Sequence, residues 1–145
     1  MSRRTGRGYE DKLLRELEEQ GLTVMSFSTT SHCDLLVLPN VLLEVKTTKL
    51  KFFNCTLTKG TNEQHAFIVD VAKRFGYVPV YAVRFINGKT SHWEFFSAND
   101  GHIFRIGQGR LMDITNSTRL YASITGLEPD VGFNSSAIKQ PSTVT

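Results

Sequence analysis

Cysteine is scarce in this chain, which has only Cys33 and Cys55 among its 145 residues. Two cysteines are too few for the disulfide framework of a small secreted protein. They do not form a Cys-x-x-Cys pair, and the four histidines lack the sequence spacing of zinc ligands. The sequence therefore predicts two reduced thiols in an intracellular protein. We expect the histidines to lie at the surface or to pack, rather than to act in catalysis: His32, His65, His92 and His102.

Long apolar runs are also missing. No window approaches the roughly 18 consecutive apolar residues that a membrane-spanning helix needs. The N-terminal stretch is basic, but it continues into a charged segment rather than the apolar centre of a signal peptide. We therefore expect no membrane association and no export, and a cytoplasmic location. With 40% hydrophobic and 21% charged residues, the chain has the balance of a globular domain rather than of a disordered one.

Neither sign of charge dominates, since 17 basic and 14 acidic residues leave a formal net charge of +3. This balance permits contact with nucleic acid without demonstrating it. The basic residues are unevenly distributed, because three arginines precede the first carboxylate and a lysine-rich stretch follows Glu44. The candidate contacts to DNA phosphates in these two stretches are Arg3, Arg4, Arg7, Lys49 and Lys51. The alternative is that these side chains are simply solvated.

The pattern of apolar and turn-forming residues predicts alternating helices and strands. The expected elements are a helix over 8–20, strands over 23–27, 34–38 and 42–48, a helix over 61–75, and strands over 78–85 and 91–96. Gly21 and Gly76 end the helices, Thr61 and Gln64 have capping-box spacing, and Asn87-Gly88 indicates a hairpin. The order α-β-β-β-α-β-β is typical of an α/β fold with a mixed central sheet flanked by helices.

The rest of the chain has a weaker pattern. We expect one domain over 1–133, with a core over 7–96 and a C-terminal extension over 97–133. Within the extension, 102–106 and 119–125 are candidate strands. Residues 134–145 are rich in small polar residues, and we expect them to form a flexible tail.

The segment from Asp34 to Lys46 carries the chemistry. Side chains alternate along a strand, so Glu44 and Lys46 project from the same face. If residues 39–41 form a three-residue turn, Leu36 faces Glu44 and Asp34 faces Lys46. The two carboxylates are then diagonal neighbours at about 7–8 Å. A two-residue turn would instead place Asp34 and Glu44 on opposite faces.

These residue types fit metal-assisted hydrolysis of a phosphodiester. Carboxylates bind Mg²⁺ through oxygen, and the metal activates water and polarises the phosphate. A lysine two residues further on can orient the water and offset developing charge. The alternative is a cross-strand ion pair between Asp34 and Lys46 beside a solvated Glu44, and the spacing by itself favours that alternative.

Glu10 shifts the balance towards a metal site. It precedes Leu13, Leu14 and Leu17 by three, four and seven residues, so it lies on the stripe of the helix that packs inward. A carboxylate facing inward needs a partner, and a nearby metal would supply one. The alternative is an acid in the first turn, favoured by the helix dipole. Together with the hairpin, the metal site is the better interpretation.

Several motifs together resemble the archaeal-type Holliday junction resolvases, whose relatives also occur in viruses and phages. The likeness covers residues 7–96. It depends on the segments Arg7-Gly8-Tyr9-Glu10, Cys33-Asp34-Leu35-Leu36, Leu43-Glu44-Val45-Lys46-Thr47, Glu63-Gln64 and Arg74 to Phe85, with Trp93 beyond. These resolvases belong to the PD-(D/E)-x-K nuclease superfamily. The resemblance implies a restriction-endonuclease-like core and a homodimer that cuts four-way DNA junctions with Mg²⁺ or Mn²⁺ and no organic cofactor. It also implies that the cytoplasm in question is that of a cell or of a virus-infected host cell.

The resemblance also implies roles for particular residues. Glu10, Asp34, Glu44 and Lys46 match the catalytic set, with Asp34, Glu44 and the carbonyl of Val45 as metal ligands. Two further features of the resolvases are a glutamine near the site and a serine in the loop before the aspartate. The candidates for them are Gln64, Ser28 and Ser31. The chain departs from the pattern in having Cys33 where proline is common, and in a short turn between the two acids.

Two other classes of function stay open at this point. A restriction-like or flap nuclease would use the same four residues on another DNA substrate, because a fold does not determine a substrate. A non-catalytic DNA-binding module would keep the fold alone. It is disfavoured because every acid and the lysine are present.

Overall fold

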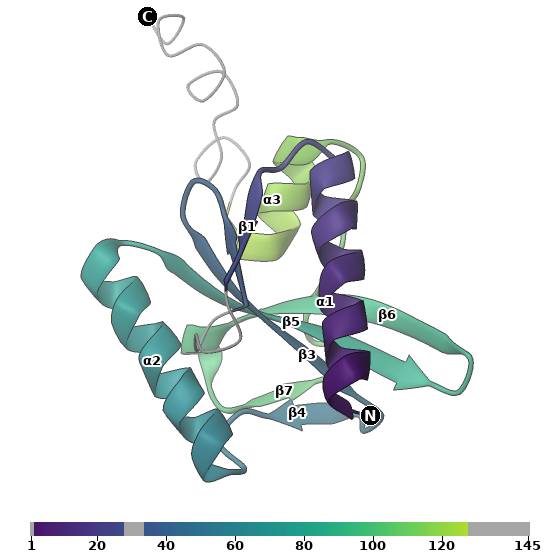
Figure 1. The fold of residues 1–145 in the computed structure, drawn as a ribbon, viewed down its shortest axis with the longest axis vertical. Coiled ribbons are helices and arrows are strands. Elements are labelled where there is room, and N and C mark those ends of the chain that lie inside the picture. The colour runs from purple at the N-terminus through teal and green to yellow at the C-terminus, as the bar shows by residue number, and fades with distance from the viewer. Residues whose placement is uncertain (1, 28–33, 128–145) are drawn as a thin grey trace, which may run out of the picture.

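The computed structural model describes residues 2–27 and 34–127, and Figure 1 shows their arrangement. In chain order the elements are α1 (Ser2–Glu19), β1 (Val24–Ser26), β2 (Leu35–Val37), β3 (Val41–Thr48), β4 (Phe52–Asn54), α2 (Lys59–Phe75), β5 (Val78–Asn87), β6 (Thr90–Ser97), the 3-10 helix η1 (Ala98–Asp100), β7 (Ile103–Arg105), β8 (Arg110–Leu111) and α3 (Ser117–Thr125). The predicted order of the first seven elements is confirmed, with β4 added between β3 and α2. No helix in these ranges is long and apolar enough to cross a membrane.

Six strands form the central sheet in the order β1-β2-β3-β5-β6-β8, and β4 and β7 form a separate two-stranded ribbon. β3 and β5 run parallel, whereas the other neighbouring strands run antiparallel. The sheet is therefore mixed, as predicted. A parallel pair needs a long connection between its strands, and α2 with β4 supplies it. The β5–β6 hairpin pairs Asn87 with Thr90, so its turn lies at Gly88 and Lys89.

Each face of the sheet is covered by different elements. On one face, Leu13 and Leu17 of α1 and three residues of α3 join a buried cluster with Leu43 and Val45 of β3. On the other face, Leu42 packs with Ile68 and Ala72 of α2. Because side chains alternate along a strand, Glu44 also projects toward the face that carries α2. Burial of each large apolar side chain contributes about 1.5–3 kcal/mol, so both layers hold the sheet in place.

The start of α2 differs from the prediction. Thr58 is the N-cap: its hydroxyl accepts from the Thr61 backbone N–H, and the Thr61 side chain accepts from the Thr58 N–H. The predicted capping pair of Thr61 and Gln64 is therefore wrong by one helical turn. At the other end, Gly76 adopts φ 74° and ends the helix as predicted. Gln64 is left without a capping role.

The predicted strand over 119–125 is wrong, because these residues belong to α3. Asn116 caps this helix by accepting a 2.8 Å hydrogen bond from the Arg119 N–H. Leu120, Tyr121 and Ile124 are all fully buried, and this spacing places them on one helical face. Burial of that face against the sheet outweighs the preference of β-branched residues for strands.

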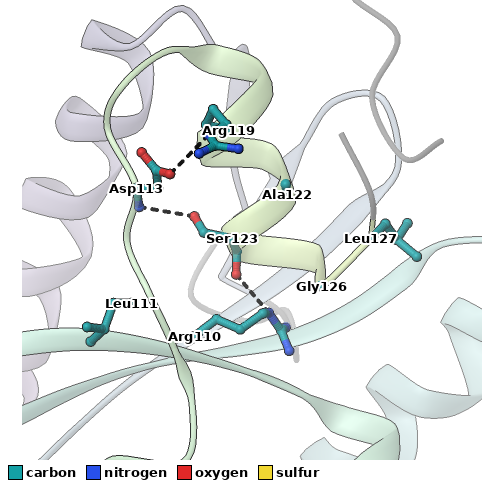
Figure 2. A pocket seen from close by; sticks show the side chains of 8 residues that line it. All are labelled: Arg110, Leu111, Asp113, Arg119, Ala122, Ser123, Gly126 and Leu127. Carbon is teal, nitrogen blue, oxygen red and sulfur yellow. Dashed lines mark hydrogen bonds and ion pairs between the residues drawn. The ribbon is translucent and has the colours of Figure 1, made fainter. Parts of the chain in front are cut away.

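A pocket separates α3 from the β8 edge, and polar contacts to the end of the helix form its wall (Figure 2). The Arg110 guanidinium donates to the carbonyls of Ser123 and Ile124 at 2.8 and 2.9 Å. A cation beside the last helical carbonyls is favourable because those groups lack partners within the helix. Arg119 forms an ion pair with Asp113 across the pocket at 3.4 Å. The polar residues that line the pocket therefore have structural roles, because they connect α3 to β8 and to the segment before the helix.

Glu94 anchors the segment that leads into β8. It is 1% exposed and accepts hydrogen bonds of 2.8 Å from the backbone N–H groups of Gly107 and Gly109, while His92 lies 2.7 Å away. Gly109 is needed at this approach, because a Cβ there would lie 2.7 Å from Glu94 Cβ and Phe96 Cζ. The described part of the C-terminal extension therefore completes the sheet. The predicted tail over 134–145 lies outside the described residues.

Glu94→Ala should lower the free energy of unfolding by about 2–4 kcal/mol, because it removes the buried, charged acceptor of two backbone hydrogen bonds and leaves a cavity. Urea denaturation followed by circular dichroism measures the loss. Asp70→Ala is the matched control: Asp70 pairs with Arg74 at 3.1 Å on an exposed part of α2, and its removal should cost less than about 1 kcal/mol. Equal losses in the two variants would contradict the anchoring role.

Candidate active site

The turn of the β2–β3 hairpin determines how the two acids meet. Leu35 pairs with Leu43, Leu36 with Leu42 and Val37 with Val41, so the three-residue turn comprises residues 38–40. The predicted turn over 39–41, which paired Leu36 with Glu44 and Asp34 with Lys46, is wrong. Continuing the observed register places Asp34 directly opposite Glu44.

Burial explains the shifted turn. Val41 is fully buried and pairs with Val78 of β5, so it belongs to the strand rather than to the turn. Leu38 is 36% exposed, and its N–H donates to the carbonyl of Thr23 at 2.9 Å. Moving the turn by one residue changes each cross-strand partner by two residues. An even change keeps every side chain on its face of the sheet, so Asp34, Glu44 and Lys46 still share one face. The prediction that the three side chains share a face therefore holds. The two acids lie directly opposite each other, which is closer than the diagonal arrangement that we predicted.

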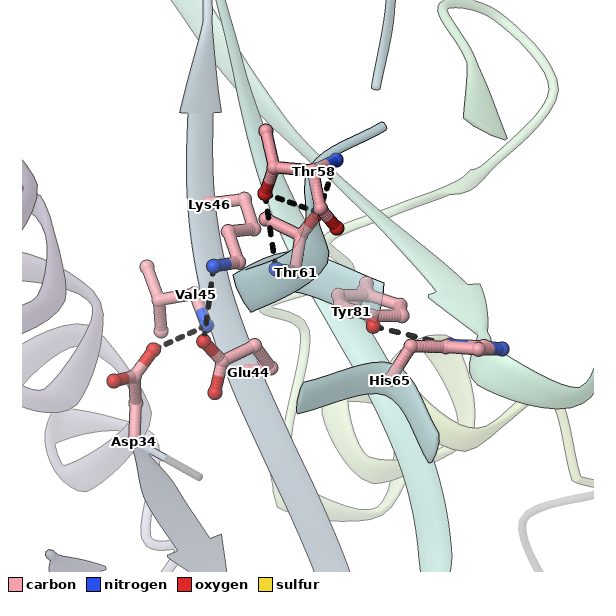
Figure 3. Close-up of polar contacts among 8 residues, drawn as sticks. All are labelled: Asp34, Glu44, Val45, Lys46, Thr58, Thr61, His65 and Tyr81. Atoms are coloured by element: carbon pink, nitrogen blue, oxygen red, sulfur yellow. Dashed lines mark hydrogen bonds and ion pairs between the residues drawn. The ribbon is translucent and has the colours of Figure 1, made fainter. Parts of the chain in front are cut away.

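The site residues contact one another directly (Figure 3). Asp34 lies just before β2, and its Oδ2 accepts a 2.8 Å hydrogen bond from the Val45 N–H. The carboxylate thereby satisfies a donor of β3 beyond the last β2–β3 pair. Lys46 Nζ lies 3.2 Å from Glu44 Oε2. The alternative of an ion pair from Asp34 to Lys46 beside a solvated Glu44 is wrong, because Glu44 is 2% exposed and is itself the partner of Lys46.

Burial raises the pKa of both carboxyl groups. For Glu44, burial is the largest cause of a pKa well above its usual range, the charge of Asp34 adds to the rise, and Lys46 opposes it. For Asp34, burial again raises the pKa, while the Val45 hydrogen bond and Lys46 lower it in part. Two acids held together away from water resist ionising together. A cation bound between them would remove that repulsion.

Glu44 Oε1 is the observation that tests whether a metal fits. This oxygen is buried, and it has no hydrogen-bond partner among the described residues. A buried carboxylate oxygen without a partner costs free energy unless a ligand satisfies it. Two carboxylates offering hard oxygen donors are the donor set that Mg²⁺ prefers. The residues present therefore fit a divalent cation held between Asp34 and Glu44.

Two phenylalanines after β3 have packing roles. Phe53 packs against the buried cluster of Tyr81, and Lys46 Nζ lies 5.9 Å from the centre of its ring. Phe52 is half-buried, with the Arg105 guanidinium over its ring at 6.0 Å. The Phe53 ring therefore offers the Lys46 ammonium group a favourable cation–π contact beside Glu44.

Glu10 comes from a different layer of the fold. Its helix α1 begins at Ser2, so Glu10 lies in the middle of the helix and the alternative of a first-turn acid is wrong. It is half-buried, and the neighbouring Tyr9 ring stacks edge-on against Trp93 with Arg84 beside both rings. Since α1 packs on the face opposite Glu44, the role of Glu10 stays a prediction.

The other predicted residues lie around the site or outside the described side chains. Lys49 and Lys51 are exposed in the connection from β3 to β4, and Gln64 is half-buried on α2. The side chains of Arg3, Arg4 and Arg7 and the loop residues Ser28, Ser31 and Cys33 lie outside the described part. Their assignments remain predictions.

The structure also brings together residues that the sequence kept apart. Tyr81 is the β5 partner of Glu44 and is 1% exposed. His65 stacks on its ring, with Nδ1 3.1 Å from the Tyr81 hydroxyl, and Cys55 and His102 lie beside His65 (Figure 3 shows the histidine and tyrosine). Burial keeps the pKa of the Tyr81 hydroxyl far above its usual range, so the group remains a neutral donor. Residues 55, 65, 81 and 102 have no sequence spacing that would have revealed this grouping.

The fold class is therefore the predicted one: an α/β core with a mixed sheet, in which a β-hairpin carries an acid pair and a lysine on one face. Among solved structures, the chain is similar to Hjc from Archaeoglobus fulgidus, a Holliday junction resolvase from an archaeal hyperthermophile, with a TM-score of 0.51 and 20% sequence identity. The similarity covers 72% of this chain and 84% of that one. It confirms the predicted restriction-endonuclease-like core at the level of the fold. No protein-family model matches the chain, and no curated protein matches it in sequence.

Proposed function

We propose that this chain is a divalent-metal-dependent endonuclease that cuts four-way DNA junctions as a homodimer. The observation that carries the proposal is the buried Glu44, which lies opposite Asp34, pairs with Lys46 and keeps one oxygen without a partner. The fold shared with an archaeal Holliday junction resolvase supports the choice of substrate. Mg²⁺ is the proposed cofactor, and Mn²⁺ would substitute for it.

Asp34 and Glu44 would hold the metal. Val45 donates its N–H to Asp34 Oδ2, which orients the carboxylate toward β3. The resemblance adds the carbonyl of Val45 as a third ligand. When bound, a divalent ion lowers the pKa of a water molecule and polarises the phosphoryl oxygen. The buried position of Glu44 excludes bulk water from one side of the pair, which strengthens electrostatic interactions there.

Lys46 is the proposed electrostatic catalyst. Its ammonium group is 3.2 Å from Glu44, and its side chain is 21% exposed, so a phosphate arriving from solvent can reach it. There it would orient the attacking water and offset negative charge developing on the phosphate. Glu10 and Gln64 are proposed to complete the site from α1 and α2.

Basic side chains around the hairpin would hold the DNA backbone. Lys49 and Lys51 are exposed directly after the strand that carries Glu44 and Lys46. Contacts of this kind position a duplex without reading its sequence. The N-terminal Arg3, Arg4 and Arg7 would add further phosphate contacts. In a two-fold symmetric dimer, two such sites could act on opposed strands of one junction.

The wild-type protein should cut a labelled four-way junction at least about tenfold faster than a duplex of the same sequence, with Mg²⁺ or Mn²⁺ present. Single-stranded and flap substrates complete the set, and sedimentation velocity measures the oligomeric state. Equal rates on junction and duplex would favour a restriction-like nuclease, and a preference for flaps would favour a flap nuclease. Binding without cutting in either metal would favour a non-catalytic DNA-binding module.

A further inference from the structure

Three side chains of the types that can bind a metal ion meet on the face of the sheet that carries α2. Cys55 follows β4, His65 lies on α2, and His102 precedes β7. One ligand atom from each residue lies within 4.8 Å of the other two. The fold alone creates this grouping, because gaps of 10 and 37 residues separate the three in sequence.

Backbone pairing holds two of these residues side by side. The β4–β7 ribbon pairs Asn54 with Ile103, and the Cys55 N–H donates to the His102 carbonyl at 2.9 Å. The His65 and His102 rings meet edge to face, with centroids 5.6 Å apart. Cys55 is fully buried, whereas His102 is exposed, so the grouping opens to solvent on the histidine side.

Tyr81 orients the third residue in the way that metal-bound histidines require. Its hydroxyl lies 3.1 Å from His65 Nδ1, which leaves Nε2 of that ring for a ligand. The same hydroxyl is a hydrogen-bonding neighbour of the Cys55 side chain. A partner on the second ring nitrogen fixes the tautomer and the direction of a histidine ligand. Burial raises the pKa of the Cys55 thiol and the Tyr81 hydroxyl opposes that rise, so a bound metal ion would supply the remaining stabilisation of a thiolate.

We infer that Cys55, His65 and His102 bind one Zn²⁺ ion, with water as the fourth ligand. Sulfur and imidazole donors select zinc over magnesium, which prefers oxygen. Zn–S and Zn–N bonds in a tetrahedral site place ligand atoms roughly 3.3–3.6 Å apart. Because the ligand atoms lie within 4.8 Å of one another, they need to approach by at most about 1.2–1.5 Å. The exposed His102 side chain can make much of that movement by rotating its ring.

The zinc site would be distinct from the acid pair, yet close to it. Tyr81, which supports His65, is the strand partner of Glu44. Zinc would connect the β4–β7 ribbon to α2, and Phe53 of β4 lies beside Lys46. The inference does not depend on nuclease activity, because its test measures metal binding alone.

Cobalt binding by the full-length, reduced, metal-free protein tests the site. One equivalent of Co²⁺ should produce a thiolate-to-cobalt charge-transfer absorption, and one equivalent of Zn²⁺ should abolish it. Cys55→Ser should lose the absorption, whereas the matched variant Cys33→Ser should keep it. His102→Ala should weaken Co²⁺ binding at least tenfold, and Asp34→Asn should bind with unchanged affinity. One equivalent of Zn²⁺ should raise the melting temperature of the wild type more than that of His102→Ala, and the difference should persist in the Asp34→Asn background, where the acid pair is removed.

Several results would overturn the inference. One is a wild-type protein that shows no charge-transfer absorption. A second is an absorption that is lost in Cys33→Ser but retained in Cys55→Ser. A third is a Co²⁺ affinity that does not change in His102→Ala. Loss of binding in Asp34→Asn would instead assign the ion to the acid pair. Should Cys55→Ser fail to fold, His102→Ala decides the matter, because its side chain is exposed and its folding is checked by circular dichroism without metal.

Discussion

Glu44→Gln should reduce the rate of junction cleavage at least about 10³-fold, because it removes a metal-binding charge that acts on the transition state. The same variant should be more stable than the wild type in metal-free buffer at neutral pH. Burial and Asp34 raise the pKa of Glu44 in the folded protein. The folded state therefore retains a proton that the unfolded state releases, and wild-type stability falls as pH rises from the ordinary glutamate pKa through the raised one. Glutamine lacks that penalty.

Single-turnover cleavage and thermal unfolding at several pH values measure the two effects together. The combination separates a lost catalytic group from a damaged fold, since an unfolded variant would lose both activity and stability. Asp113→Asn is a matched control, because Asp113 pairs with Arg119 near α3, away from the acid pair. Cleavage by Glu44→Gln at the wild-type rate would reject the proposed site. A variant less stable than wild type at neutral pH would contradict the buried-charge argument.

Lys46→Ala should lower the cleavage rate about 10²–10³-fold while weakening junction binding much less, because the ammonium group is proposed to act at the reacting phosphate. The acidic limb of the pH–rate profile should also move to higher pH. Lys46 lowers the pKa of Glu44, so without it that carboxyl ionises at higher pH. Rates across pH at saturating Mg²⁺ measure both changes.

Lys49→Ala provides the comparison for Lys46. Lys49 is exposed and lies three residues beyond Lys46. Its loss should weaken binding and reduce the salt dependence of affinity by about one charge, with little change in the single-turnover rate. If the two variants had the same effect on the rate and the same pH profile, Lys46 would be a phosphate-binding residue rather than a catalytic one.

The buried acid Glu44 lowers the stability of the fold, but the apolar residues on either side of it hold its strand in place. Glu44 lies between Leu43 and Val45, both of which are buried on the opposite face. The strand is therefore held in place by the side chains that flank the acid. The site gains a rigid carboxylate shielded from water, and the cost is the free energy of burying a charge. Natural proteins accept such local violations where function requires them.

The sequence by itself determined the features that depend on neighbours along the chain. Alternation along a strand placed Glu44 and Lys46 on one face, and an odd number of turn residues added Asp34 to it. Glycine at Gly21 and Gly76 ended the helices, because left-handed backbone is accessible there without a Cβ clash. The order of the first seven elements followed from the same local signals.

Tertiary structure decided what depends on burial between distant segments. Pairing of Val41 with Val78 drew that residue out of the turn and set Asp34 opposite Glu44. Packing of Tyr121 against the sheet made 119–125 part of a helix where the local pattern had indicated a strand. The grouping of Cys55, His65 and His102 arose in the same way. Such contacts join residues tens of positions apart, and their free energy comes from surfaces that exist only once the sheet has formed.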